Sequence, residues 1–206
     1  MALKPFYSPS TFSISNKLPS YLTEAQLNSL TAQFQAWFDK APERWRGARA
    51  RHWAVFLVLR FSGARLGEIL RINDSQDINW REGEIRIPTL KRRQKAFRTV
   101  FLPQNVLTEL SRILAERPEL RGRLFSVHER VFRRIFAEQA RAAGLPKELS
   151  HPHVLRHSRA IEMIRAGVPL TLIQQLLGHA ALTTTAVYLQ VFQGEARQIL
   201  QEKGLI

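Results

Sequence analysis

The sequence predicts a mainly α-helical protein with a small antiparallel β-sheet, which is an α+β fold. Two observations carry this prediction. Apolar residues recur at helical spacing over most of the 206 residues, whereas residues 77–102 form short segments rich in β-forming side chains. Because no linker, repeat or low-complexity block divides the chain, we expect a single domain over residues 21–191.

The first predicted helix begins with a capping box. Thr23 and Gln26 have the spacing at which two side chains satisfy the first free backbone N–H groups of a helix. Apolar residues follow at helical spacing as far as Phe38. The segment 41–47 contains a proline and a glycine, so we expect it to interrupt the helix.

A nearly continuous apolar stretch over residues 53–59 predicts a helix that is buried in the core. Ser62 and Gly63 interrupt it, and a short helix is expected over residues 65–70.

Three short segments after this helix predict antiparallel strands. Ile85 and Ile87 alternate with charged neighbours, which is the period of two that a half-buried strand shows. The basic segment from Leu90 to Ala96 is expected to form the tip of a hairpin. The strands are predicted over residues 77–80, 84–89 and 97–102.

Helical spacing resumes after the strands, first over residues 106–114. Ser126 and Glu129 form a second predicted capping box, and Gly144 is expected to end the helix that follows. Further helices are predicted over residues 154–166, 169–177 and 183–191, with an N-terminal arm over residues 1–20 and a C-terminal helical tail over residues 192–206.

The charge of the chain gives the first indication of function. Thirty-one Lys and Arg residues against seventeen Asp and Glu residues give a net charge of +14, and such a field attracts polyanions, chiefly nucleic acid. The helix after Glu129 carries arginines opposite its apolar side. They could contact the DNA backbone or groove, or they could form an ordinary solvated face; they include Arg130, Arg133 and Arg134.

Membrane and redox functions are poorly supported. No apolar run approaches the ~18 residues that span a bilayer, and no signal peptide pattern is present. The chain has no cysteine, which excludes disulfide and thiolate chemistry and fits a cytoplasmic protein.

Several residues could together cleave a phosphodiester. This reaction needs a nucleophile, positive charge on the non-bridging oxygens and a proton for the leaving oxygen. Arg65 and Arg156 could each bind phosphate oxygens bidentately, and Tyr188 could attack. Because an unperturbed tyrosine has a pKa of about 10, it needs a base, for which His153 is available.

Two further residues would complete such a site. Lys91, in the basic hairpin, could protonate the leaving oxygen, although Lys95 lies in the same turn and is an alternative. His179 could bind a phosphate oxygen. The arginines supply the positive charge, so the reaction would require no metal or other cofactor.

A metal site is the competing chemical interpretation. His153 and His157 stand four residues apart on a predicted helix, a spacing that can bind zinc, and His151 and His179 could join them. Against this, the chain has no cysteine and the nearest helical carboxylate, Glu162, lies off that face. We therefore expect no metal, and we expect His157 to be a structural residue beside the site.

These segments resemble the tyrosine recombinase, or phage integrase, family. Gly63–Ile69 (Gly-Ala-Arg-Leu-Gly-Glu-Ile) resembles the first arginine box of the family, and His153–His157 resembles its His-x-x-Arg box. Leu176–Tyr188 resembles the segment from its second histidine to its nucleophile, nine residues later. The resemblance extends over residues 22–188, and three boxes in this order make it specific.

The resemblance implies a catalytic domain that cleaves and rejoins double-stranded DNA through a 3′-phosphotyrosyl link, without metal or ATP. It also implies a homotetramer on DNA, with a monomer as the free form, in which the C-terminal tail packs on a neighbouring subunit. The implied roles are Tyr188 as nucleophile, Arg65, Arg156 and His179 on the scissile phosphate, His153 as base and Lys91 as acid, with Arg92, Arg93 and Lys95 as DNA contacts.

Members of this family usually carry a separate N-terminal helical domain. Few residues precede Thr23, so we expect this chain to be the catalytic domain alone, similar in size to the short fimbrial phase-switch invertases. Integration, excision and inversion are equally compatible with the sequence. The alternative function is a non-catalytic DNA-binding regulator on the same fold. Either protein would be cytoplasmic and associated with the nucleoid.

Overall fold

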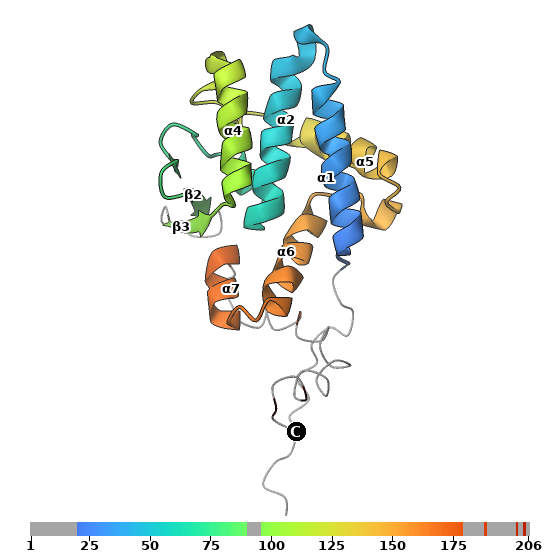
Figure 1. The fold of residues 1–206 in the computed structure, drawn as a ribbon, viewed down its shortest axis with the longest axis vertical. Coiled ribbons are helices and arrows are strands. Elements are labelled where there is room, and N and C mark those ends of the chain that lie inside the picture. Colours follow the sequence, from blue (N-terminus) through green and yellow to red (C-terminus); the bar gives the residue numbers. More distant parts are fainter. Residues whose placement is uncertain (1–19, 90–95, 179–187, 189–200, 202–203, 205–206) are drawn as a thin grey trace, which may run out of the picture.

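The computed structural model describes residues 20–89, 96–178, 188, 201 and 204 (Figure 1). Helices dominate these residues, and a small antiparallel sheet accompanies them, so the predicted fold class is confirmed. The elements are α1 Glu24–Asp39, α2 Glu43–Ser62, α3 Leu66–Ile69, β1 Ile78–Asn79, β2 Glu84–Thr89, β3 Ala96–Phe101, α4 Gln104–Glu116, the 3₁₀ turn η1 Pro118–Leu120, α5 Glu129–Ala142, the 3₁₀ turn η2 Lys147–Leu149, α6 His153–Arg165 and α7 Leu170–Leu177.

Helix α2 is the centre of the fold. It runs between α1 and α4, while α6 and α7 lie at the end where α2 finishes (Figure 1). Every side chain from His52 to Arg60 is buried, as the apolar stretch predicted. Phe56 stacks on Phe34 of α1 with ring centroids 4.1 Å apart, and Phe136 of α5 lies 5.8 Å from Phe34. This aromatic cluster joins three helices in one core.

The predicted interruption over residues 41–47 was too long. Helix α2 begins at Glu43, directly after Pro42 in the N-cap position, so Gly47 lies inside the helix. A glycine inside a helix costs about 1 kcal/mol relative to alanine. The burial of the twenty-residue helix outweighs that cost.

The second predicted capping box was also wrong. Helix α5 begins at Glu129 and its N-cap is His128, whose side chain accepts a hydrogen bond from the Arg130 N–H. The Ser126 N–H instead donates to the Arg123 carbonyl, so Ser126 belongs to the preceding turn. By contrast, the capping box of Thr23 and Gln26 at the start of α1 is confirmed.

The sheet has the strand order β1-β2-β3, and both pairs are antiparallel. Ile85 and Ile87 are fully buried, as their alternation predicted. Ile87 pairs with Arg98 of β3, and β3 contacts α7. The first strand is shorter than predicted and spans Ile78–Asn79.

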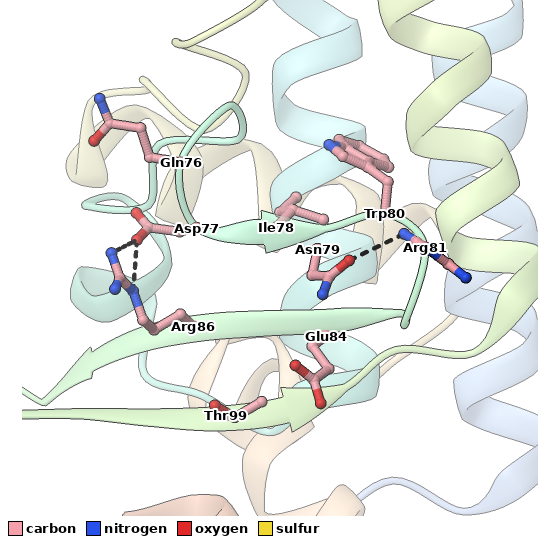
Figure 2. A pocket seen from close by; sticks show the side chains of 9 residues that line it. All are labelled: Gln76, Asp77, Ile78, Asn79, Trp80, Arg81, Glu84, Arg86 and Thr99. Carbon is pink, nitrogen blue, oxygen red and sulfur yellow. Dashed lines mark hydrogen bonds and ion pairs between the residues drawn. The ribbon is translucent and has the colours of Figure 1, made fainter.

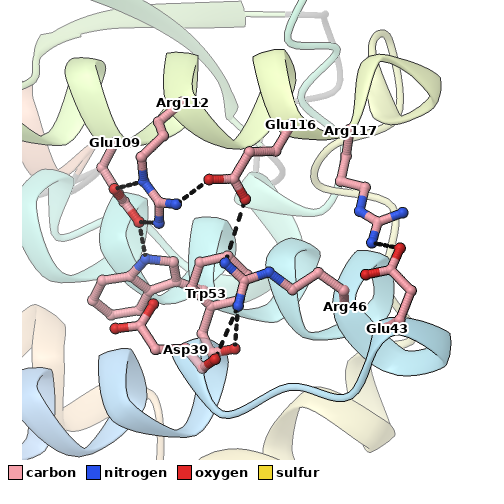
Figure 3. Close-up of polar contacts among 9 residues, drawn as sticks. Asp39, Glu43, Arg46, Trp53, Glu109, Arg112, Glu116 and Arg117 are labelled. Carbon is pink, nitrogen blue, oxygen red and sulfur yellow. Dashed lines mark hydrogen bonds and ion pairs between the residues drawn. The ribbon is translucent and has the colours of Figure 1, made fainter.

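A polar network fastens α4 to α2 (Figure 3). The Trp53 indole N–H donates to Glu109 at 2.7 Å, and Arg112 binds the same carboxylate through two nitrogens. Arg46 of α2 pairs with Glu116 at the end of α4. These contacts fix the side of the fold that lies away from α6 and α7 (Figure 1).

Within the described ranges, no helix is both long enough and apolar enough to cross a bilayer. Three predicted segments lie almost entirely outside those ranges: residues 1–20 apart from Ser20, residues 183–191 apart from Tyr188, and residues 192–206 apart from Gln201 and Gly204.

Candidate active site

Arg156 joins the ends of two helices. It lies on the first turn of α6 and is 2% exposed. Its Nη1 donates to the Gly63 carbonyl at 2.9 Å and to the Leu177 carbonyl at 2.8 Å. Its Nη2 is buried and has no hydrogen-bond partner within the described part of the chain. The Nη2 group of this guanidinium therefore has donor capacity that the described residues leave unused.

Gly63 permits the close approach on which this arrangement depends. It caps the C-terminus of α2 in the left-handed conformation, with φ +63°. A Cβ at this position would lie 2.7 Å from Leu177 Cδ2. Glycine therefore satisfies both the backbone conformation and the contact with α7, and the chain turns directly into the segment that carries Arg65.

A buried carboxylate holds Arg65 in place. Glu68 is fully buried and accepts hydrogen bonds from the backbone N–H and Nη1 of Arg65, both at 3.0 Å. It also accepts from Arg98 Nη2 at 2.7 Å, and Arg98 Nε donates to the Leu176 carbonyl. Burial raises the pKa of Glu68, but Arg98 and Arg65 together lower it by more than burial raises it. The pKa of Glu68 therefore lies below its ordinary value. The ionised carboxylate thus links α3, β3 and α7.

Arg65, Arg133 and His153 line one cavity of about 280 Å³, between the start of α3, α5 and the start of α6. Arg133 is largely exposed and pairs with Glu129 at 2.6 Å. Arg134 instead lines a separate cavity beside Trp37. The arginine face of α5 is therefore solvent-exposed, and its Arg133 shares an opening with two candidate catalytic residues.

A larger hollow, of about 620 Å³, lies along the sheet (Figure 2). Its polar side chains include Asp77 and Arg86, which form an ion pair with each other. Among the predicted site residues that the structure describes, none lines this hollow. It is therefore a weaker candidate for the chemistry than the smaller cavity.

Two histidines of α6 are held in their neutral form. The rings of His153 and His157 pack edge to face with centroids 4.6 Å apart. Desolvation and the nearby charge of Arg156 lower the pKa of His153 to about 4. Desolvation, together with His153 and Arg156, lowers the pKa of His157 to about 4. Both rings can therefore accept a proton at neutral pH.

Tyr188 is buried against α6 and α7. It is 3% exposed and belongs to a small apolar cluster with Ile161, Ile173 and Leu177. Its hydroxyl oxygen lies 2.7 Å from Nδ1 of His157. Burial raises the pKa of Tyr188 above its ordinary value, although Arg156 and Arg65 act in the opposite direction. The phenol is therefore neutral and would need a proton acceptor to become a nucleophile.

The structure brings four predicted residues together: Arg65, His153, Arg156 and Tyr188. Sequence reasoning missed the Arg98–Glu68 pair and the contact between His157 and Tyr188. The spacing of four residues after His153 was a signal for His157, but Arg98 had none. The remaining candidates, Lys91, Arg92, Arg93, Lys95 and His179, lie outside the described residues.

The described residues define a class of site. Two arginines supply positive charge, a buried tyrosine supplies a hydroxyl and two neutral histidines supply proton acceptors. Such a set suits nucleophilic attack on a phosphate ester. In the described ranges, no three side chains of the metal-binding types converge.

The chain belongs to the phage integrase family, whose model matches residues 20–195. It is 31% identical over 187 residues to a tyrosine recombinase of Thermosipho africanus, covering 88% of this chain and 61% of the relative. It is 30% identical over 202 residues to the tyrosine recombinase XerA of Pyrococcus furiosus, covering 94% of this chain and 65% of the relative. The chain thus spans less than two thirds of the length of these relatives.

The crystal structure of the site-specific recombinase XerH bound to its difH substrate superposes with a TM-score of 0.71. The two chains are 25% identical, and the match covers 84% of this chain and 51% of XerH. The fold assignment and the family assignment therefore agree.

Proposed function

We propose that this protein is a site-specific DNA recombinase of the integrase or invertase type, which cleaves and rejoins DNA through a 3′-phosphotyrosyl link to Tyr188. The observation that carries the proposal is the convergence of Tyr188 with Arg65, Arg156 and two neutral histidines in a member of this family. The similarity to the site-specific recombinase XerH bound to its difH substrate, and to the Tn1549 transposon integrase in complex with transposon right end DNA, supports DNA, which we propose is double-stranded, as the partner.

The two arginines bind the non-bridging oxygens of the scissile phosphate. Arg65 lines the open cavity, and Arg156 offers its unpartnered Nη2. Both neutralise the negative charge that builds up on these oxygens during attack. Arg156 remains protonated at neutral pH, because desolvation and the charge of Arg65 lower its pKa only to about 10.

In the cleavage step, the Tyr188 oxygen forms a bond to phosphorus and the bond from phosphorus to the 5′ oxygen breaks. The phenolic proton passes to a histidine on the first turns of α6, a role that the family resemblance gives to His153. Lys91 protonates the leaving oxygen, and His179 binds a phosphate oxygen. A 5′-hydroxyl of another strand reverses the step, so the reaction needs no ATP or metal.

A conformational change precedes cleavage. Arg156 and Tyr188 are 2% and 3% exposed, so a phosphate can reach them only after neighbouring atoms move. Assembly of a homotetramer on DNA supplies this change, with the tail over residues 192–206 docked on a neighbouring subunit and the basic hairpin on the DNA backbone.

The free protein is a monomer in the cytoplasm, associated with the nucleoid when bound to DNA. Deletion of residues 193–206 without a change in assembly on DNA contradicts this part of the proposal.

The test is trapping of a covalent protein–DNA adduct. The substrates are nicked duplexes whose central segment is randomised, mixed with protein in EDTA, and adducts are separated on denaturing gels. We expect an adduct with wild type and none with Tyr188→Phe, while Tyr21→Phe is the matched control that retains it. DNA binding by the wild-type protein without any covalent adduct would favour the alternative function, a non-catalytic DNA-binding regulator on the same fold. Cleavage that the chelator abolishes would favour a metal-dependent hydrolase.

A further inference from the structure

The hydroxyl of Tyr188 is hydrogen-bonded to a histidine other than the one that the family resemblance assigns as base. Its oxygen lies 2.7 Å from Nδ1 of His157, with the two ring centroids 5.8 Å apart. His153 packs its ring against His157 and lines the cavity that also contains Arg65. One histidine therefore faces the phenol and the other faces the cavity.

The helix explains this division of contacts. His153 and His157 lie one turn apart on the same face of α6. His153, at the start of the helix, is exposed, whereas His157 is half-buried beside the cluster that contains Tyr188. A phosphate that enters the cavity meets His153 first, while His157 lies behind it, next to the nucleophile.

We propose that His157, rather than His153, accepts the proton of Tyr188 during attack on DNA. This inference rests on the proposed function and names a further catalytic residue for it. The tyrosine oxygen bonds to phosphorus, the phosphorus–O5′ bond breaks, and the phenolic proton moves to Nδ1 of His157. The imidazole becomes an imidazolium, and the leaving oxygen takes its proton from another group. His153 then binds the phosphate through a ring N–H.

The surroundings of His157 fit this role. Among the described residues, the charged and titratable groups around it are His151, His153 and Arg156 on and before α6, with Tyr188 packed opposite. They hold the free imidazole neutral, and in the Nε2–H tautomer, which this inference requires, Nδ1 has a lone pair that accepts the phenolic proton. A bound phosphate brings negative charge to the site and raises the proton affinity of the ring when it is needed.

The experiment compares His157→Asn with the matched variant His153→Asn. Asparagine can accept a hydrogen bond but cannot take a proton at these pH values. The substrate is a duplex selected from the randomised pool with wild-type protein, and the single-turnover rate of adduct formation is measured against pH. We expect His157→Asn to lose about 10²–10⁴-fold in rate, with a rate that rises with pH because hydroxide must remove the phenolic proton.

His153→Asn should keep the pH dependence of wild type, even where its rate is lower. A second variant, His157→Ala, should regain at least about tenfold in rate with added imidazole, which replaces the missing base. Imidazole rescue also separates loss of the base from loss of the fold. Two outcomes overturn this inference while leaving the recombinase function intact. One is a near-normal rate of adduct formation in His157→Asn that does not change with pH. The other is a rate that rises with pH in His153→Asn instead. Absence of an adduct with wild type overturns both.

Discussion

At the scale of single residues, Arg156 combines a structural role and a chemical role. Its Nη1 satisfies two backbone carbonyls at the ends of α2 and α7, and its Nη2 remains available. A lysine cannot do both, because its ammonium is a single compact donor centre rather than a planar fork.

Arg156→Lys should therefore lose cleavage while keeping most of its DNA binding. Removal of one donor to a charged transition state typically costs about 10²–10³-fold in rate. The measurements are the single-turnover rate of adduct formation and the dissociation constant for DNA at a fixed salt concentration. A cleavage rate close to that of wild type contradicts the proposed phosphate clamp.

The two neutral histidines predict a pH dependence of stability. The pKa values of His153 and His157 fall from 6.5 in the unfolded chain to about 4 in the folded protein. Between these values the unfolded chain binds more protons, so the free energy of unfolding falls as the pH drops from 6.5 to about 4. Urea unfolding over this range should show a smaller loss in His157→Gln than in wild type. Equal losses in both proteins exclude His157 as a source of the effect.

The residues of the site were predictable to different degrees. The family boxes predicted that Arg65, His153, Arg156 and Tyr188 would be close, and four such residues do converge. The partner of the phenol was not predictable, because the choice between two histidines one turn apart depends on how α7 and residue 188 pack against α6.

At the scale of the elements, the ends of the helices position the site. The C-terminus of α2, the start of α3 and the C-terminus of α7 meet around Arg156. The sequence predicted these helices well, α2 from its nearly continuous apolar stretch and α7 from its pattern over residues 169–177. The N-caps of helices were harder to predict. The sequence motif indicated Ser126 as the N-cap of α5, but His128 occupies that position, and its capping role depends on the local turn.

Two glycines allow a test of the contact between α2 and α7. Gly63 and Gly144 both have positive φ, but an added Cβ meets Leu177 at 2.7 Å in the first case and nothing within 4 Å in the second. Gly144→Ala should cost about 1–2 kcal/mol of stability from backbone strain alone. Gly63→Ala should cost more, and should also slow cleavage. Chemical unfolding of both variants gives the comparison, and equal losses contradict the proposed packing role of Gly63.

The buried pair of Arg98 and Glu68 should contribute strongly to stability. Arg98→Ala removes the hydrogen bonds to Glu68 and to the Leu176 carbonyl, and it leaves the fully buried Glu68 with less compensation. Breaking a buried pair in this way costs about 3–5 kcal/mol. Arg133→Ala is the control, since an exposed pair contributes roughly 0–1 kcal/mol. A loss below about 1 kcal/mol in Arg98→Ala, measured by urea unfolding, contradicts a structural role for this pair.

At the scale of the whole molecule, the net charge of +14 predicts that DNA binding weakens steeply as salt increases. The logarithm of the binding constant should fall linearly with the logarithm of the salt concentration, by about 0.9 for each phosphate contact. Arg133→Gln should reduce this slope by roughly one contact if Arg133, at the mouth of the cavity, binds a phosphate. An unchanged slope places Arg133 outside the interface.

The two hydrogen bonds from Arg156 to the carbonyls of Gly63 and Leu177 have a consequence for the evolution of inactive copies of this gene. A copy of this gene that no longer needed to cut DNA could lose the hydroxyl of Tyr188 with little damage to the fold, since phenylalanine would fill the same apolar cluster. The same copy could not discard Arg156, because two buried carbonyls would lose their donor. The presence of Arg156 in such a copy would therefore reflect the requirements of folding, whereas the presence of Tyr188 would reflect activity.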